Sequence, residues 1–182
     1  MTKIPDLHTH STASDGTLTP DALLQRAAGV GVEIMALTDH DTLAGLDAAH
    51  AASLRLGIQL IPGVEVSVTW NARTIHIVGL DVDPDCAELQ QGLAGLREFR
   101  QWRAEEIGRR LDKQGIAGAY AGARALAQGE LVGRTHFARF LVERGHAENV
   151  RDVFKRFLVS SKPGHVTGRW ASLEEAVGWI RT

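Results

Sequence analysis

The chain has 182 residues, of which 44% are hydrophobic and 23% are charged, and its formal net charge is −2. These values are ordinary for a globular protein of one domain, or of one domain with an insertion. No run of 18 apolar residues occurs, which excludes a membrane-spanning helix, and the single Cys86 excludes an internal disulfide. We therefore expect a cytoplasmic protein without a membrane partner.

The N-terminal stretch Asp6-Leu7-His8-Thr9-His10 follows a strand-like start, and Asp15 comes five residues later. In an extended segment residues i and i+2 lie on one face, so Asp6, His8 and His10 point the same way. Two imidazoles with a carboxylate close by make half of a site for a divalent metal ion. Taken alone, the pattern is equally compatible with two histidines near an unstructured terminus.

The next part of the chain alternates between helix and strand patterns. Thr19-Pro20-Asp21 has the residue types of the N-cap, N1 and N2 positions, so we expect a helix from there to about Gly29. Residues 33–38 form a short apolar run typical of a buried strand, which ends in Asp39-His40-Asp41-Thr42. A second helix is expected over residues 42–56.

Residues 59–68 and 74–80 are expected to form two further strands, joined as a hairpin. The first strand carries Glu65, and the second carries His76 between two isoleucines that face the other side. A single histidine on a strand is more often structural than a ligand. For His76 the ligand role is favoured here, because the other candidate ligands also fall at or near strand ends, where α/β folds place catalytic and binding residues.

The remainder of the chain reads as helical. Helices are expected over residues 88–114, 119–128, 135–144 and 149–159. No strand pattern appears between residues 85 and 160, which breaks the earlier rhythm. We therefore interpret residues 99–165 as a small helical domain inserted into an α/β domain.

The predicted domain boundaries follow from this interpretation. Residues 1–98 form the N-terminal part of the α/β domain, residues 99–165 the helical insertion, and residues 166–182 the return to the first domain. The return contains Ser172-Leu173-Glu174-Glu175, a capping box that opens a helix. An α/β fold would continue with another strand, so we expect the C-terminal part of that domain to be absent from this chain.

Charge is distributed unevenly along the chain. Residues 1–96 carry 4 Lys and Arg against 12 Asp and Glu, whereas residues 97–170 carry 15 against 8. An acidic part with candidate metal ligands and a basic part together suggest a cation site and an anion site. We interpret most of the basic residues as solvated bystanders, including the helix-face residues Arg103, Arg110 and Arg124.

The candidate metal ligands are four imidazoles and two carboxylates: His8, His10, Asp15, His40, Glu65 and His76. This is too many ligands for one tetrahedral zinc ion. Two divalent ions with Glu65 as a bridge fit better, and mixed nitrogen and oxygen ligands suit Mn, Fe or Zn. Paired ions about 3.5–4 Å apart activate water and bind a phosphoryl group.

These residues lie in motifs that resemble, in the same order, those of the PHP family, named for polymerase and histidinol phosphatase. The motifs are Asp6-Leu7-His8-Thr9-His10-Ser11, Ser14-Asp15-Gly16, Thr38-Asp39-His40-Asp41-Thr42, Pro62-Gly63-Val64-Glu65 and Ile75-His76-Ile77-Val78-Gly79. The resemblance implies an α/β fold of the distorted (β/α)7 barrel type, two or three divalent metal ions with manganese first, and hydrolysis of phosphate esters. It carries the six ligands over position by position.

Two stretches of the insertion resemble the PHP members that act on nucleotides. They are Gly133-Arg134-Thr135-His136-Phe137-Ala138-Arg139 and Lys162-Pro163-Gly164-His165-Val166. Those members remove the 3′-phosphate from nucleoside 3′,5′-bisphosphates, such as pAp to AMP, or trim 5′ nucleotides from short RNA. We expect Arg134, His136 and Lys162 to bind the non-reacting 5′-phosphate of the substrate.

Three aspartates are expected to orient the ligands rather than to bind metal: Asp6, Asp39 and Asp41. The family also has C-terminal motifs, an Ala-His-Pro-like one and an Asp-x-His one, that do not occur in this chain. Their absence puts a third metal ion and full activity in doubt for these 182 residues.

Two other functional classes remain compatible with the sequence. An amidohydrolase acting on a C–N bond also uses His-x-His on its first strand, but it has no need of a basic helical insertion. A non-catalytic module that binds nucleotide or nucleic acid would carry a degenerate metal site, against which the six intact ligands argue. The expected partner is a nucleotide or a short RNA, and we expect a monomer.

Overall fold

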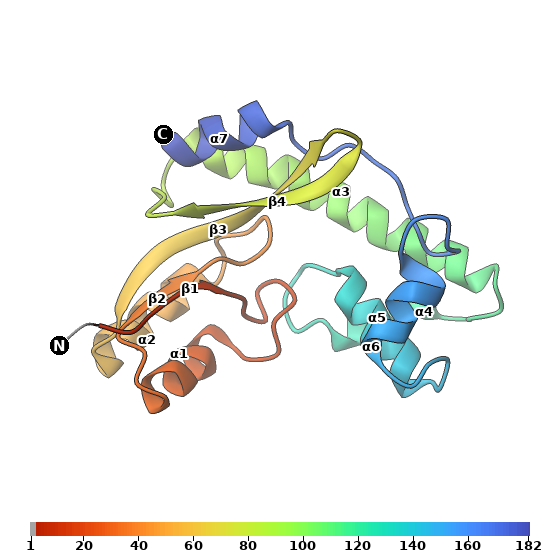
Figure 1. Ribbon diagram of the computed structural model, residues 1–182, viewed down its shortest axis with the longest axis horizontal. Helices are drawn as coiled ribbons and strands as arrows, with labels where there is room; N and C mark the ends of the chain where they lie inside the picture. Colours follow the sequence, from red (N-terminus) through yellow and green to blue (C-terminus); the bar gives the residue numbers. More distant parts are fainter. Residues whose placement is uncertain (1–2) are drawn as a thin grey trace. The chain divides into compact units, whose positions relative to one another are not determined.

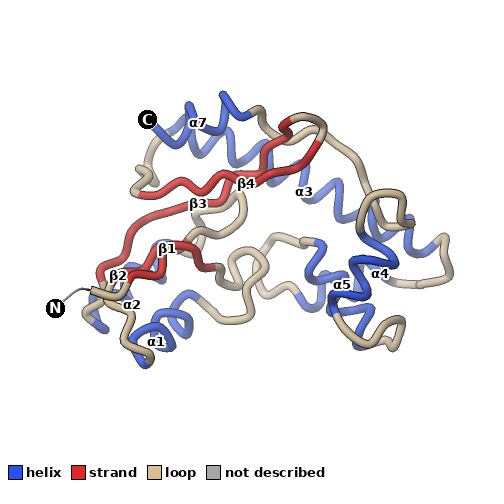
Figure 2. The backbone as a smooth tube through the Cα atoms, viewed as in Figure 1, coloured by secondary structure: helices blue, strands red, loops and turns tan. Residues whose placement is uncertain are grey.

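The computed structural model describes residues 3–182, and Figures 1 and 2 show its helices and strands. The chain divides into two compact units. The first, here called the sheet unit, runs up to Arg97 and resumes with Arg169–Thr182, and the second, the helical unit, comprises Glu98–Gly168. All strands among the described residues belong to the sheet unit.

The sheet unit contains four strands in the spatial order of the chain: β1 (Pro5–Thr9), β2 (Ile34–Leu37), β3 (Gln59–Trp70) and β4 (Arg73–Leu80). β1, β2 and the start of β3 run parallel. The long β3 leaves β2 after Pro62 and pairs antiparallel with β4 from Gly63 onward. Figure 2 shows β3 bending between these two pairings, so a single strand joins the parallel and the antiparallel part of a curled sheet.

The hairpin between β3 and β4 turns at Asn71 and Ala72, whose φ angles are 47° and 59°. Two successive residues with positive φ are typical of a type I′ turn, whose twist matches that of the paired strands. The predicted strands over residues 59–68 and 74–80 are confirmed, since they lie within β3 and β4.

α1 (Pro20–Gly29) begins as predicted, because Thr19 is its N-cap and accepts a hydrogen bond from the Ala22 amide. α2 (Leu46–Leu56) begins later than the predicted residue 42. Residues 42–45 form turns instead, because the Ala44 amide donates to Thr42 Oγ1 at 3.2 Å and the Leu46 amide donates to the Leu43 carbonyl at 3.0 Å. Both helices pack on an apolar core that includes Leu24, Met35, Leu37, Ala49, Ala52 and Ile58.

α7 (Leu173–Arg181) begins at the predicted capping box. The Glu175 amide donates to Ser172 Oγ at 3.1 Å, and the Ser172 amide donates to Glu175 Oε2 at 2.7 Å. The helix lies beside β3 and β4 (Figure 1) and against the first part of the long α3 (Ala87–Asp112). Gly92 of α3 allows this approach, because a Cβ there would lie 2.5 Å from the Trp179 ring.

The helical unit contains the rest of α3 together with α4 (Ala119–Leu126), α5 (Arg134–Glu143), α6 (Val150–Val153) and a π-helical turn (Phe154–Leu158). The helix predicted over residues 149–159 is therefore a short α-helix that widens into a π turn. The core of this unit includes Ile107, Leu111, Ala123, Phe137, Leu141, Val153 and Leu158. Gly122 sets the distance between α4 and α5, because a Cβ there would lie 2.1 Å from the Phe140 ring.

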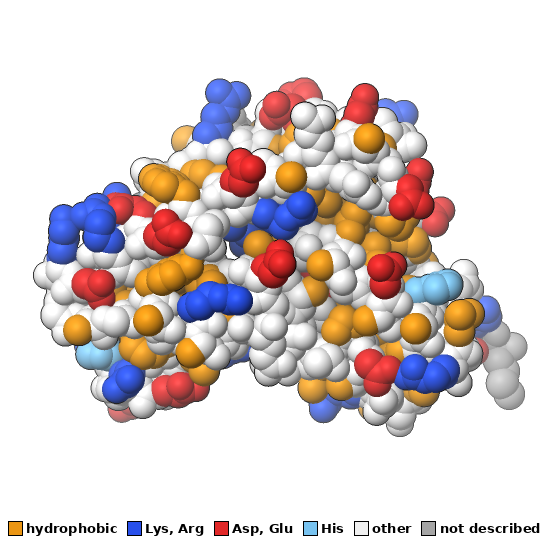
Figure 3. Space-filling view, turned by 180° about the vertical axis from the view of Figure 1, so that it is seen from behind, with side chains coloured by type: hydrophobic (Ala, Val, Ile, Leu, Met, Phe, Trp, Pro, Cys, Tyr) orange, Lys and Arg blue, Asp and Glu red, His pale blue; other side chains and the backbone are white. Residues whose placement is uncertain are grey.

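The surface carries both signs of charge. On the face drawn in Figure 3, acidic, basic and apolar side chains are interspersed without a large patch of one kind. Among residues 3–182, no helix has the length and apolar character needed to cross a membrane.

Candidate metal centre

Glu65 of β3 lies at the centre of a cluster of imidazoles in the sheet unit. Its Oε2 atom is 3.1 Å from His8 Nε2 and 2.9 Å from His10 Nε2. The same atom is 3.4 Å from His40 Nδ1, while Oε1 is 2.9 Å from His76 Nδ1. Each carboxylate oxygen therefore faces at least one imidazole, which is the arrangement that a carboxylate bridging two metal ions requires.

Asp15 extends the cluster on the side of His10 and His40. Its Oδ1 atom lies 3.6 Å from His10 Nδ1, and its Oδ2 atom lies 4.0 Å from His40 Nε2. His10 Nδ1 is buried and has no hydrogen-bond partner in the described part of the chain. A buried polar atom of this kind costs free energy unless a ligand satisfies it, so the geometry fits a bound cation.

Three overlapping groups of side chains can each hold a metal ion, because the ligand atoms within a group lie within 4.8 Å of one another. The groups are His8–His10–Glu65, His10–Asp15–His40 and His40–Glu65–His76. The fold thus brings together all six residues that the sequence marks as candidate ligands. Their nitrogen and oxygen donors fit Mn, Fe or Zn, and binding of metal by these six residues stays a prediction.

Strand geometry accounts for much of this convergence. His8 belongs to β1, and His10 comes two residues after His8, just past the end of that strand. The centroids of the two imidazole rings are 5.2 Å apart. On β4, His76 stands opposite Ser67 in the ladder, two residues along β3 from Glu65. Positions two apart share a face, so His76 reaches the Glu65 carboxylate diagonally across the two strands.

His10 and Glu65 shift each other's pKa. Burial by itself would raise the pKa of Glu65, but hydrogen bonds with His10 and His76 outweigh it and hold that pKa well below its usual range. Burial would lower the pKa of His10, yet the hydrogen bond with Glu65 and the charge of Asp15 raise it above 6.5. Without metal, the two groups therefore favour an imidazolium–carboxylate pair, and a metal ion competes with that proton.

The three aspartates predicted to orient the ligands have different surroundings. Asp39 and Asp41 are buried, with 2% and 0% of their surface exposed, and neither belongs to the three ligand groups. Asp39 accepts hydrogen bonds from Ser11 and Ser14, and Asp41 accepts one from the Ser67 amide. Asp6 is exposed on β1, and within residues 3–182 it makes no hydrogen bond or ion pair that would support its predicted role.

The residues predicted to bind phosphate belong to the helical unit. His136 is buried, and its Nδ1 accepts a hydrogen bond from the Gly133 amide at 3.0 Å, which caps α5. Lys162 is exposed. Arg134 is half-buried at the first residue of α5, with its guanidinium carbon 5.6 Å from the centre of the Phe154 ring. Thus His136 has a structural role in capping α5. Binding of the 5′-phosphate by Arg134 and Lys162 stays a prediction.

Arg103 differs from the expectation that it is a solvated bystander. Its side chain is half-buried, and its Nε donates to the Val166 carbonyl at 3.5 Å. Burial, together with the charges of Arg134 and Arg100, lowers the pKa of Arg103 to about 9. Burial, together with the charges of Arg103, Arg134 and Arg110, also lowers the pKa of His165. The helical unit therefore concentrates several cationic side chains, and helical periodicity alone did not show which of them are buried.

Arg97 is a further residue that sequence reasoning missed. It is half-buried at the end of the sheet unit's part of α3, and its Nη1 donates to the Asp41 carbonyl at 3.3 Å. No carboxylate pairs with it among the described residues. A positive charge thus stands next to the residue that follows His40. No motif marks this arginine, because only the fold brings α3 to the end of β2.

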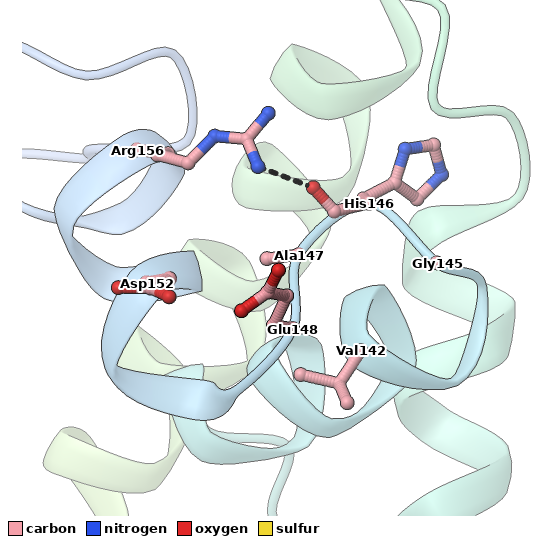
Figure 4. Close-up of a pocket in the computed structure, with 7 residues that line it drawn as sticks. All are labelled: Val142, Gly145, His146, Ala147, Glu148, Asp152 and Arg156. Atoms are coloured by element: carbon pink, nitrogen blue, oxygen red, sulfur yellow. Dashed lines mark hydrogen bonds between the residues drawn. The ribbon is translucent and has the colours of Figure 1, made fainter.

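A separate surface hollow lies in the helical unit (Figure 4). It is lined by Val142, Gly145, His146, Ala147, Glu148, Asp152 and Arg156. Arg156 Nη1 donates to the His146 carbonyl at 2.7 Å, as Figure 4 shows. The hollow includes none of the predicted site residues and none of the metal-ligand groups found in residues 3–182.

Comparison with known proteins relates this chain to a family. The family model described as the PHP domain matches residues 6–166. A curated protein of Chromobacterium violaceum, the 3′,5′-nucleoside bisphosphate phosphatase, is 50% identical over 176 residues, covering 96% of this chain and 62% of the relative. The 5′-3′ exoribonuclease Rnm of Escherichia coli is 48% identical over 179 residues, covering 97% of this chain and 61% of the relative.

Two solved structures have a closely similar fold. An amidohydrolase from Chromobacterium violaceum, solved with bound sulfate and no metal, superposes with a TM-score of 0.95 at 49% identity, covering 97% of this chain and 63% of the other. A protein from Bifidobacterium adolescentis, named for metal-dependent phosphoesterase activity, superposes with a TM-score of 0.91 at 28% identity, covering 98% and 63%. The chain thus spans somewhat less than two thirds of the length of these relatives.

Proposed function

The chain belongs to the PHP domain family, and we propose that it is a metal-dependent phosphoesterase that hydrolyses a phosphate monoester of a nucleotide. The substrate that we favour is a nucleoside 3′,5′-bisphosphate, whose 3′-phosphate is released, as in the conversion of pAp to AMP. One observation carries the proposal: six side chains with nitrogen or oxygen donors, Glu65 among them, converge in three overlapping groups, each able to hold a divalent ion. The relative named 3′,5′-nucleoside bisphosphate phosphatase supports the choice of substrate.

We propose two or three divalent ions at this centre, with manganese first and iron or zinc next. His8, His10, Asp15, His40, Glu65 and His76 would hold them. When bound, such ions supply a water of lowered pKa and withdraw charge from the phosphoryl group. Glu65 would join the ions, because its two oxygens face different imidazoles. The imidazoles would fix the positions of the ions, because His8 and His76 lie on β1 and β4 and His40 is paired with Glu65 in a parallel bridge.

The helical unit would recognise the part of the nucleotide that does not react. We propose that Arg134 and Lys162 bind the 5′-phosphate, with Arg103 as an addition suggested by its burial close to Arg134. His136 would contribute its Nε2 side only, because Nδ1 already accepts the Gly133 amide. A guanidinium suits bidentate contact with a phosphate, and a lysine suits a single contact.

We also propose that the complete fold is a distorted (β/α)7 barrel in which residues 99–165 form an inserted helical domain. The parallel strands β1, β2 and β3, which alternate with α1 and α2, support a barrel of this type. The two compact units, with boundaries after Arg97 and Gly168, support the insertion. A cytoplasmic monomer is part of the same proposal, and the single Cys86 supports a reducing compartment.

A second candidate function is the removal of 5′ nucleotides from short RNA. The relative from Escherichia coli named 5′-3′ exoribonuclease Rnm, 48% identical, favours it, as does the excess of basic residues in the helical unit. An amidohydrolase reaction is the third alternative, because one similar solved structure carries that name.

Assays on three substrate classes test the proposal with protein loaded with Mn²⁺. The expected result is release of phosphate from a nucleoside 3′,5′-bisphosphate at a higher kcat/KM than release of 5′ nucleotides from a 5′-phosphorylated tetranucleotide. A cyclic amide should not be hydrolysed. Hydrolysis of the cyclic amide alone, or of no substrate by protein that has bound its metal, would contradict the proposal.

A further inference from the structure

Two buried aspartates flank His40 and bind different parts of the polypeptide. The backbone of this segment pairs with Glu65 itself, because the Glu65 amide donates to the Asp39 carbonyl at 3.2 Å and the Asp41 amide donates to the Glu65 carbonyl at 3.1 Å. His40 therefore stands opposite Glu65 in an isolated parallel bridge. Asp39 and Asp41 are one residue away on either side. The left-handed φ of 52° at Asp41 interrupts the alternation that would otherwise put both side chains on one face, and the two carboxylates bind different groups.

The Asp39 carboxylate is devoted to the segment that carries Asp15. Its Oδ1 accepts the Ser11 amide at 2.8 Å and the Ser14 hydroxyl at 2.5 Å, and its Oδ2 accepts the Ser11 hydroxyl at 2.6 Å. Ser11, Ser14 and Asp39, which form this network, are all buried. Three hydrogen bonds to one buried carboxylate make a rigid attachment, because breaking any of them leaves an unsatisfied buried group.

The segment itself has little freedom to adjust. The amides of Ser14 and Gly16 both donate to the Ser11 carbonyl, at 3.1 and 2.9 Å. Gly16 packs so closely on the preceding chain that a Cβ would lie 2.3 Å from the His10 carbonyl oxygen. Asp15 stands between these two anchored residues, so its position follows from the attachment of the segment to Asp39.

Asp41, the residue after His40, binds the β3–β4 hairpin. Its Oδ1 accepts the Ser67 amide at 2.6 Å, and both residues are buried. Ser67 lies two residues beyond Glu65 on β3 and is the ladder partner of His76 on β4. Asp41 thus ties the end of β2 to the part of the hairpin that presents Glu65 and His76.

We propose that Asp39 and Asp41 are positioning residues with separate duties, Asp39 for the metal subsite of His10, Asp15 and His40, and Asp41 for the subsite of His40, Glu65 and His76. This inference rests on the proposed function only for the premise that the centre binds divalent ions. It goes beyond a general orienting role, because it assigns each aspartate to one subsite and predicts that either subsite can be weakened alone.

Calorimetric titration of metal-free protein with Mn²⁺ tests the inference. Two reference variants identify the subsites: Asp15→Asn should weaken one class of sites, and His76→Ala the other. Asp39→Ala should weaken the class that Asp15→Asn weakens, by about 10- to 100-fold, and leave the other class unchanged. Asp41→Ala should show the reverse pattern, whereas Asp41→Asn should bind like the wild type, because an amide oxygen can still accept the Ser67 amide and asparagine tolerates the positive φ.

A second pair of variants guards against a variant that does not fold. The double variant Ser11→Ala/Ser14→Ala removes two of the three donors to Asp39 without touching the carboxylate. It should weaken the Asp15 class in the same direction as Asp39→Ala. Thr12→Val is the matched control, because the Thr12 hydroxyl lies in the same segment and has no hydrogen-bond partner among the described residues. Circular dichroism establishes that each variant is folded.

The outcomes separate the two proposals. Selective loss of one class in the Asp39 variants and of the other in Asp41→Ala supports the division of duties. Equal weakening of both classes by folded Asp39→Ala, or no change in the double serine variant, overturns it while leaving the proposed function intact. Wild-type protein that binds no Mn²⁺ overturns both proposals.

Discussion

His10 Nε2 lies 2.9 Å from Glu65 Oε2, so two side chains that are candidate ligands of the same metal ions are also partners of each other. The pair raises the pKa of the imidazole and lowers that of the carboxylate. It follows that metal binding at this centre must displace a proton from a stabilised ion pair.

Replacing Glu65 by glutamine should remove more than one ion. The change keeps the size of the side chain but removes its negative charge. In the wild type both carboxylate oxygens face imidazoles, Oε2 that of His10 and Oε1 that of His76. Elemental analysis of protein purified without chelator should find about two ions per wild-type chain and well under one in Glu65→Gln, because a bridging ligand serves both ions. Glu33→Gln, at an exposed glutamate just before β2, is the control and should keep wild-type stoichiometry. Retention of one full ion by Glu65→Gln would mean that Glu65 serves a single ion.

Metal affinity should rise with pH above 6.5. The pKa of His10 in the folded, metal-free protein is raised above 6.5, so its pairing stabilises that form at pH values below 6.5 and the contribution is lost as pH rises through the raised pKa. A metal ion needs the unprotonated imidazole, so binding should release a proton in this range. Calorimetry in two buffers with different ionisation enthalpies measures that release. A pH-independent affinity between pH 6 and about 8 would rule out the competition.

Arg134→Ala should impair the bisphosphate reaction selectively. A charge-assisted phosphate contact contributes about 1.5–3 kcal/mol, which corresponds to a loss of roughly 10- to 150-fold in kcat/KM with a nucleoside 3′,5′-bisphosphate. The loss should be much smaller with a 3′-monophosphate, which lacks the second phosphate. Arg124→Ala is the control, because Arg124 is exposed on α4 and donates to the Gly129 carbonyl. Equal losses on both substrates would place Arg134 at the reacting phosphate or in the fold alone.

Sulfate should stabilise the helical unit through its half-buried arginines, Arg103 and Arg134. The lowered pKa of Arg103, about 9, shows that burial and the neighbouring Arg134 and Arg100 disfavour its charged form. A doubly charged anion near these groups offsets that penalty, so sulfate should raise Tm more than chloride does at equal ionic strength. Arg103→Ala should reduce this difference, whereas Arg109→Ala, at an exposed residue paired with Glu106, should not. The same increase in Tm for both variants would show that sulfate acts non-specifically.

The sequence predicted the local structure around the centre well, because local rules decide it. The alternation of side chains along a strand put His8 and His10 on one face before the fold was known. The capping residues Thr19 and Ser172 marked where α1 and α7 begin. The expected start of α2 at residue 42 is wrong, because the Thr42 hydroxyl accepts the Ala44 amide and residues 42–45 form turns before the helix begins.

The sequence by itself determined which residues are candidate metal ligands, that they lie on or near strands, and the motif order of the family. Only the tertiary structure decided that Glu65 faces imidazoles from both sides, that Asp39 is attached to the Asp15 segment, and that Arg103 is half-buried. The physical reason is range: propensity, caps and strand alternation act over a few residues. Registers between strands and the burial of one helix face depend on segments tens of residues apart, such as the 28 positions between Ser11 and Asp39.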